Sequence, residues 1–367
     1  MLTVAHLITG LETGGAERML ARLVTTTDPA RFRSVVISLT GPGTIGPEIA
    51  AAGIPLHSLG ARRGRPDPRP LARLFRVLGE CRPDILQTWL PHADLMGSLA
   101  RLGRRAPRLV WNIRATEMVR ADRVRWVLAR LSRLPDAVVV NAAAGRRYHE
   151  GLGYRPRRWV YIPNGFDAAA LRPDPTMREL QRTLLGLPDD AVAILLPARY
   201  HPVKDHPNFL AAAELLAARR PEAWFVLVGA GAGRDNPALV VPGLGDRLLR
   251  LGERSDLARL YPAFDIVTLS SAVGEGFPNV LGEAMLCGIP CVATDSGDSG
   301  LVIGDPDRIV PPRNPDALAA AWERVIALGI EGRRTLGAAG RARVAAEYDL
   351  AAIVGRYEAL YEGIAVS

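Results

Sequence analysis

The chain has 367 residues, enough for two domains at roughly 100–200 residues each, and 48% of them are hydrophobic. No apolar run approaches the roughly 20 residues of a membrane span, so no transmembrane helix is predicted. The three cysteines, Cys81, Cys287 and Cys291, lack the spacing of a zinc site. Because the N-terminus enters an apolar run without a basic leader or cleavage site, we expect a cytoplasmic protein.

The net charge of +8 is unevenly distributed along the chain. Through Asp167 there are 26 arginines against 13 acidic residues, whereas the remainder has 20 basic and 25 acidic residues. An arginine-rich first half suggests an anionic partner such as lipid headgroups, a lipid diphosphate or nucleic acid. A solvated arginine surface explains the same composition, so the charge alone leaves both interpretations open.

In chain order, the first half alternates short apolar runs with amphipathic ones. Strands are expected at 3–9, 34–39, 54–59, 84–89, 108–113, 137–141 and 158–162. Helices are expected between them at 15–27, 47–52, 69–81, 94–103, 121–134 and 143–151. This repeated βα pattern predicts a doubly wound parallel sheet.

Turn residues at 162–175 predict a linker, after which a second βα series begins. Its strands are expected at 192–197, 224–228, 247–251, 266–270, 290–294 and 308–310, and its helices at 207–220, 236–241, 256–262, 278–287 and 315–328. The amphipathic end of the chain is expected to pack back on the first domain. The fold class is therefore α/β, with two Rossmann-like domains, 1–168 and 169–348, facing across a cleft and a C-terminal helical segment, 349–367.

The stretch 270–290, SSAVGEGFPNVLGEAMLCGIP, combines two carboxylates with an expected helix N-terminus. An apolar run ending in two serines predicts a buried strand, and a helix is expected to begin near Pro278. Glu275 then lies in the loop before the helix, and Glu283 lies within it. Because helix amides bind anions and carboxylates hold hydroxyls, this arrangement suggests a nucleotide-sugar pocket.

The first strand of the second domain ends in PARYHPVKDHPN. Arg199 and Lys204 stand five apart across this loop, where both cations are able to point at one diphosphate. Lys204 is the only lysine in a chain whose other 45 basic residues are arginine. A compact ammonium group is therefore indicated at this position, unless a single lysine has persisted by chance.

Other candidate motifs are weaker. The loop LITGLETGGAERML brings Gly14 and Gly15 to a helix N-terminus, which suits either a ligand or a tight turn. GAGAG at 229–233 has the wrong glycine spacing for a dinucleotide loop, and GDSG at 297–300 and DPD at 305–307 lack the context of a nucleophile or a metal site. His92 and Arg114 follow expected strands and are acceptor-side candidates, although a surface histidine is an equal interpretation of His92.

With these motifs in this order, the chain resembles glycosyltransferase family 4, whose members are retaining, metal-independent enzymes of the GT-B fold. The resemblance runs nearly end to end, through GGAER, IPNGFD, RYHPVK and EGFPNVLGEAMLCGIPCVATD. GGAER is similar to members that add sugars to lipid-linked acceptors during cell-surface glycan assembly. The resemblance implies a nucleotide-diphosphate sugar, most simply a UDP-sugar, as co-substrate, with neither a metal nor another cofactor.

The resemblance also implies roles for residues that match the family's motifs. Arg199 and Lys204 would neutralise the donor diphosphate and the leaving phosphate, and Glu275 would contact hydroxyls of the donor sugar. Fixed cations and helix amides would stabilise the charge that develops on the departing diphosphate. The donor-binding residues implied are Gly14, Gly15, Glu253, Arg254, Phe277, Pro278, Asn279, Val280 and Glu283.

The sequence departs from the family at one place. Many members carry a histidine after the fifth strand of the first domain, whereas the matching stretch VWNIRATE ends its strand at Arg114.

The expected partners are a nucleotide-sugar donor, a lipid-linked or glycan acceptor and an anionic membrane surface at the inner face of the cytoplasmic membrane, without nucleic acid. The alternatives are a sugar-nucleotide epimerase of the same architecture and a non-catalytic anionic-lipid or nucleic-acid binder.

Overall fold

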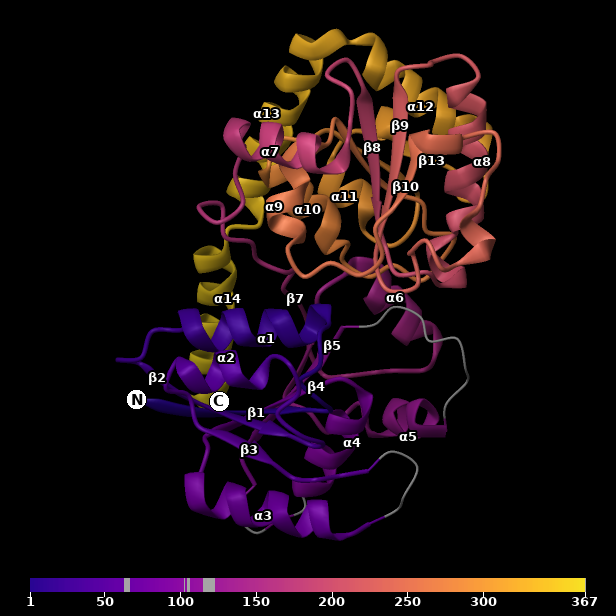
Figure 1. The fold of residues 1–367 in the computed structure, drawn as a ribbon. Coiled ribbons are helices and arrows are strands. Elements are labelled where there is room, and N and C mark those ends of the chain that lie inside the picture. The colour runs from indigo at the N-terminus through magenta and orange to yellow at the C-terminus, as the bar shows by residue number, and fades with distance from the viewer. Residues whose placement is uncertain (63–66, 102, 104–105, 115–122, 367) are drawn as a thin grey trace. The chain divides into compact units, whose positions relative to one another are not determined.

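The computed structural model describes the chain except for residues 63–66, 102, 104–105, 115–122 and 367. The described residues form two compact units (Figure 1). The first unit is Met1–Gly165 together with Leu350–Ser367, and the second is Phe166–Asp349. The chain therefore leaves the first unit within the expected linker and returns to it for the C-terminal helix.

The first unit is built around a seven-stranded parallel sheet of order β3-β2-β1-β4-β5-β6-β7. Its strands are β1 (Leu2–Ile8), β2 (Phe32–Ser38), β3 (Leu56–Ser58), β4 (Ile85–Trp89), β5 (Arg108–Ile113), β6 (Ala137–Val140) and β7 (Trp159–Tyr161). Its helices are α1 (Gly15–Thr26), α2 (Gly46–Ala51), α3 (Arg69–Cys81), α4 (Pro91–Ala100), α5 (Arg123–Leu131), α6 (Ala143–Gly151) and α14 (Leu350–Ala365). Residues 102, 121 and 122 of two expected helices lie outside the described residues. Central strands such as β4 are buried along their whole length, which explains their continuous apolar runs.

The C-terminal helix α14 packs on this first sheet, beside α1 (Figure 1). Tyr357 and Tyr361 are fully buried in its core, where Tyr357 stacks on Trp89 with ring centroids 6.4 Å apart. Arg31, which precedes β2, pairs with Glu358 of the helix at 3.0 Å. The tail thus completes the apolar cover of one face of the first sheet.

The second unit is built around a six-stranded parallel sheet of order β10-β9-β8-β11-β12-β13. Its strands are β8 (Val192–Pro197), β9 (Ala223–Val228), β10 (Leu248–Arg250), β11 (Ile266–Leu269), β12 (Cys291–Thr294) and β13 (Ile309–Val310). Its helices are α7 (Pro175–Leu185), α8 (His206–Ala217), α9 (Leu257–Leu260), α10 (Asn279–Leu286), α11 (Ser299–Ile303), α12 (Pro315–Ala327) and α13 (Gly329–Glu347). Five 3₁₀ turns complete it: η1 (Pro202–Lys204), η2 (Pro237–Leu239), η3 (Gly245–Arg247), η4 (Tyr261–Ala263) and η5 (Pro306–Arg308).

Three helices of the second unit, α7, α11 and α13, were not predicted, and one prediction was wrong. The helix expected at 236–241 is only the single turn η2. Helix α13 contains several glycines, which lower helix propensity. The structure explains Gly337, because a Cβ there would overlap the backbone of Gly288 at the end of α10. Close packing of α13 against the end of α10 thus requires glycine, and glycine makes the helix harder to predict from the sequence.

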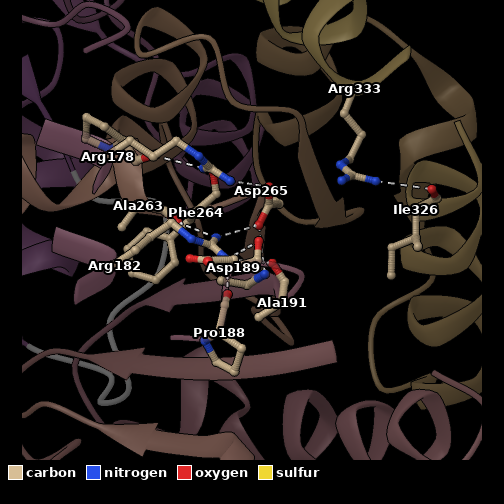
Figure 2. A network of polar contacts seen from close by, with 12 residues as sticks. Arg178, Arg182, Pro188, Asp189, Ala191, Ala263, Phe264, Asp265, Ile326 and Arg333 are labelled. Carbon is tan, nitrogen blue, oxygen red and sulfur yellow. Dashed lines mark hydrogen bonds and ion pairs between the residues drawn. The ribbon is translucent and has the colours of Figure 1, made fainter. Parts of the chain in front are cut away.

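Helix α7, which was also not predicted, is fixed to the sheet by a polar network (Figure 2). Asp265 lies immediately before β11. Arg178 and Arg182 both bind its carboxylate, at 2.8 and 3.2 Å. Arg182 also donates to the carbonyls of Pro188 and Ala191, at 2.7 and 2.8 Å. This network holds α7 at the edge where the strands begin.

Candidate functional site

The carboxyl edge of the second sheet brings the chain's only lysine to Glu275. Lys204 ends the turn η1 after β8, and Glu275 lies in the loop between β11 and α10. Because β8 and β11 are neighbouring parallel strands, both loops lie at the same edge of the sheet. The Lys204 ammonium forms an ion pair with the Glu275 carboxylate, and 23% and 10% of the two side chains are exposed.

Residues around Glu275 hold its loop in place. The Ser271 hydroxyl donates to the same carboxylate oxygen that Lys204 binds. The amide of Ala272 donates to the carbonyl of Val203 at 2.9 Å, which joins the Glu275 loop to the Lys204 turn. Sequence reasoning missed Ser271, although two serines ending a buried strand were a visible signal.

The GDSG segment belongs to the same corner of the second unit. Gly297 has a φ of +63°, and a Cβ on it would overlap the backbone of Glu275. The amide of Asp298 donates to the carbonyl of Gly276 at 3.1 Å. The segment therefore packs against the Glu275 loop and holds it in place. This contact explains Gly297 without a role for the segment as a nucleophile.

Helix α10 begins directly after this loop. Pro278 is its N-cap residue, and no side chain of the described residues caps it. Phe277 and Pro278 are buried, whereas Asn279 and Val280 are half-buried. The ring of Phe277 packs against Tyr348, with centroids 5.2 Å apart, which fixes the loop as it enters the helix. An uncapped helix N-terminus beside a carboxylate and an ammonium is suited to binding a polar anionic ligand.

Glu283 lies within α10 and is half-buried. The hydroxyl of Tyr261 donates to its carboxylate at 3.3 Å. Burial raises the pKa of Tyr261 well above its ordinary value, and the neighbouring Glu283 charge raises it further. Tyr261 therefore remains a protonated hydrogen-bond donor that orients one oxygen of Glu283.

The loop after β9 is bonded both to the segment that leads into the Lys204 turn and to the loop after β10. Tyr200 donates its amide to Ala230 at 2.7 Å, and Gly229 donates to Gly252 at 2.8 Å. Gly229 has a φ of +148°, and a Cβ there would overlap the backbone of Ala198. The GAGAG loop thus uses glycine for close packing of neighbouring loops.

Three sequence-predicted residues lie in these loops. Arg199 is exposed in the loop after β8, ahead of the turn η1 that ends in Lys204. Glu253 is exposed after β10, and Arg254 makes a two-pronged ion pair with Asp256, with both distances 2.7 Å. The structure therefore places these side chains on loops at the same edge of the sheet, after β8 and β10, which flank β9. Of the predicted set, Lys204 and Glu275 are joined by an ion pair.

The candidates of the first unit lie at the carboxyl edge of its own sheet. Gly14 is the N-cap of α1, and a Cβ there would overlap the carboxylate of Glu17. Gly15 is the first residue of the helix. His92 is exposed in the first turn of α4, after β4. These positions match the strand ends expected from the sequence.

Arg114 has several partners within the first unit. Its guanidinium donates to Asn164 and, at 2.7 Å, to the Tyr357 hydroxyl of α14. It also stacks over the Trp89 ring, 4.7 Å from the centroid. Burial lowers the pKa of Arg114 below its ordinary value. These contacts could not be predicted from local sequence patterns, because Tyr357 is 243 positions away.

Solved structures share this architecture. The Anabaena protein HepE, crystallised with UDP, superposes with a TM-score of 0.85 at 20% identity over 99% of this chain and 100% of that one. Sucrose-phosphate synthase from Thermosynechococcus elongatus gives a TM-score of 0.82 at 20% identity over the full length of both chains. The fold is the two-domain GT-B fold of glycosyltransferases, as the sequence predicted.

Family models match both halves of the chain. Residues 13–170 match the model described as Glycosyltransferase Family 4, and residues 191–327 match the model described as Glycosyl transferases group 1. The chain belongs to the GT-B glycosyltransferases of the family 4 type, which confirms the resemblance found in its sequence.

Curated relatives are similar over parts of their length. A GDP-mannose-dependent monoacylated phosphatidylinositol monomannoside mannosyltransferase of Corynebacterium glutamicum is 27% identical, and the match spans 55% of each protein, about half of that relative's length. The putative glycosyltransferase EpsF of Bacillus subtilis is 26% identical over 80% of this chain and 79% of its own. A UDP-Gal:α-D-GlcNAc-diphosphoundecaprenol α-1,3-galactosyltransferase of Escherichia coli is 25% identical over 71% and 70%.

Proposed function

We propose that this protein transfers a sugar from a nucleotide-diphosphate sugar, most simply a UDP-sugar, to a lipid-linked or glycan acceptor. The observation that carries the proposal is the Lys204–Glu275 ion pair beside the uncapped N-terminus of α10. The ammonium suits the diphosphate of such a donor, and the carboxylate suits its sugar hydroxyls. The helix amides suit the negative charge that develops on the leaving group.

The charges of the pair suggest how the donor is accommodated. Without a donor, the ammonium of Lys204 is neutralised by Glu275. A diphosphate is a stronger hydrogen-bond acceptor for Lys204 than the Glu275 carboxylate. The exposed Arg199, earlier in the same loop, adds a second cation. Lys204 then binds phosphate while Glu275 is released to accept hydrogen bonds from sugar hydroxyls. The Ser271 hydroxyl holds the carboxylate in position during this exchange.

The same edge supplies sites for the rest of the nucleotide. Glu283, whose carboxylate accepts a hydrogen bond from Tyr261, would accept hydrogen bonds from ribose hydroxyls. The backbone around Glu253 and Arg254 would meet the base, and Phe277 to Val280 the β-phosphate.

We further propose that transfer proceeds with retention and without a metal. As the glycosidic bond breaks, negative charge develops on the leaving diphosphate, and Lys204, Arg199 and the α10 amides stabilise it. The leaving phosphate takes the acceptor proton on the same face of the sugar, so no protein base is required.

The acceptor class rests on relatives whose names specify lipid-linked acceptors, a phosphatidylinositol mannoside and a diphosphoundecaprenol-linked sugar. The arginine-rich first half supports peripheral attachment to an anionic membrane at the cytoplasmic face. Within the described residues, no helix is both long and apolar enough to cross a bilayer.

A thermal-shift screen of UDP-, GDP- and ADP-sugars tests the proposal. A donor present at 100 times its dissociation constant adds about 2.7 kcal/mol to the free energy of unfolding, so the correct nucleotide should raise Tm visibly. A shift with GDP-sugars alone would replace UDP with GDP, and the absence of any shift would contradict donor binding. The shifting donor is then used in a transfer assay with undecaprenyl-diphosphate-linked and phosphatidylinositol acceptors.

A further inference from the structure

A second, unassigned pocket lies in the first unit, at the edge where β6 and β7 begin. It has a volume of about 760 Å³ and is lined by Arg133, Arg155 and Arg157, with Trp159 and Glu150 beside them. Arg133 precedes β6 and the other two arginines precede β7. Because the strands are parallel, this is the edge opposite to the strand ends that His92 and Arg114 follow.

The pocket carries more positive charge than its own residues neutralise. Its only acidic lining residue, Glu150, is paired with Arg146 at 2.8 Å. Among the described residues, the side chains of Arg133 and Arg157 have neither an ion-pair nor a hydrogen-bond partner. Like charges gathered around a concave surface repel one another and raise the local concentration of anions. An anionic ligand would relieve this repulsion.

The third arginine is held in place before any ligand arrives. One terminal nitrogen of Arg155 donates to the carbonyls of Glu150 and Tyr154, at 2.8 and 2.7 Å. The amide of Arg155 donates to the Ser132 hydroxyl at 2.8 Å, which ties the loop to the end of α5. These bonds fix the orientation of the Arg155 guanidinium group and leave its other N–H groups available to a ligand. Pre-positioned guanidinium groups bind phosphate in two-pronged geometry at low entropic cost.

Trp159 adds an apolar wall to this charged pocket. Its ring is half-buried at the start of β7, and Arg146 lies over it with its guanidinium carbon 6.0 Å from the centroid. An indole wall beside three guanidinium groups suits a phosphate ester better than a bare ion, because the organic part also finds a surface to contact.

We infer that the Arg133–Arg155–Arg157 pocket is a binding site for a phosphate group, separate from the proposed donor site. The phosphate belongs either to the headgroup of an anionic phospholipid or to a soluble phosphate compound. Both present the same chemistry to the three arginines, and they are distinguished by experiment. The inference does not depend on the proposed transfer activity.

The test compares the wild-type protein with the double variant Arg133→Gln/Arg157→Gln. Both side chains are exposed and unpaired among the described residues, so the variant should keep its fold and Tm. The control, Arg33→Gln/Arg82→Gln, removes the same charge from exposed positions elsewhere in the unit. Binding to pyrophosphate is measured by calorimetry with all three proteins also carrying Lys204→Ala, so that the proposed donor site contributes less to the signal. Binding to vesicles of phosphatidylcholine with or without phosphatidylglycerol is measured by sedimentation.

Saturable pyrophosphate binding that weakens about tenfold or more in the double variant, but not in the control, would identify a soluble phosphate site. Binding to phosphatidylglycerol vesicles alone, lost in the double variant and kept in the control, would identify a headgroup site. Equal losses in both variants would show non-specific attraction by net charge and overturn the inference. Failure of the wild-type protein to bind either probe would overturn it as well.

Discussion

Two ion pairs lie at opposite ends of the same strand in the second unit, and they differ in their surroundings. Before β11, Asp265 is bound by Arg178 and Arg182, and it also accepts a hydrogen bond from the amide of Ala193 at 2.9 Å. After β11, Glu275 is bound by Lys204 and Ser271, beside an uncapped helix N-terminus.

The difference separates a structural pair from a candidate functional one. Arg182 and Asp265 are each 9% exposed, and both terminal nitrogens of Arg182 also donate to main-chain carbonyls (Figure 2). Lys204 is 23% exposed, and its ammonium binds a single carboxylate. Removing one partner of such a buried, hydrogen-bonded pair is costly, because the other charge is left uncompensated. A more open pair with spare donors can exchange its partner for a ligand.

The largest expected effect on stability is that of Arg182→Met. Removing Arg182 leaves Asp265 with less compensation in a buried position, so we expect the free energy of unfolding to fall by about 3 kcal/mol, at the lower end for broken buried pairs because Arg178 remains. Urea unfolding followed by circular dichroism measures this loss. The control is Arg219→Met, whose exposed pair with Glu323 should contribute under about 0.5 kcal/mol. Similar losses for both variants would contradict the comparison.

Lys204→Ala, in contrast, should lower the rate of sugar transfer more than it lowers stability. If Lys204 stabilises the leaving diphosphate, sugar transfer should fall about 10²–10³-fold, the range for losing one transition-state donor. Because the side chain is partly exposed, the unfolding curve should change much less than that of Arg182→Met. Initial rates with the donor identified by thermal shift measure the loss. Wild-type rates in this variant would remove Lys204 from the site.

How far the sequence predicted this picture depends on how local each feature is. The parallel sheets were predictable, because fully buried strands such as β4 and β8 must be continuous apolar runs. Lys204 and Glu275 were both singled out, yet their contact was not, because it joins residues 71 positions apart through the order of strands in the sheet.

Other features could not be read from local patterns. The partners of Arg114 come from α14 and from the end of the first unit, so its contacts depend on tertiary packing. Helix α13 was missed because its glycines allow close approach to α10, which only the folded chain reveals. Helix α7, in contrast, had visible signals: Asp174 caps its first turn at 2.9 Å and Gly186 ends it in the left-handed conformation.

Glu283→Gln should give a smaller effect, confined to donor binding. An amide keeps the size of the side chain but replaces one acceptor oxygen with a donor, so ribose hydroxyls lose a charge-assisted bond. We expect the KM for the donor to rise about tenfold while kcat changes little. Steady-state kinetics separate the two constants. A fall in kcat with an unchanged KM would instead place Glu283 in the chemical step.

The smallest expected effect is that of Asp256→Asn. The Arg254–Asp256 pair is about one-third exposed on both sides, so its loss should change the free energy of unfolding by under about 0.5 kcal/mol. Urea unfolding with the Arg219→Met protein as reference checks this. A change as large as that of Arg182→Met would show that exposure does not distinguish the ion pairs of this unit.

The most direct test of the central claim is calorimetric titration of the donor into the wild-type protein and the Lys204→Ala variant. Our account predicts one donor site per chain and an affinity at least about tenfold weaker in the variant, because the diphosphate loses its ammonium partner. Equal affinities for the two proteins would contradict the claim that the Lys204–Glu275 pair opens to receive a nucleotide sugar.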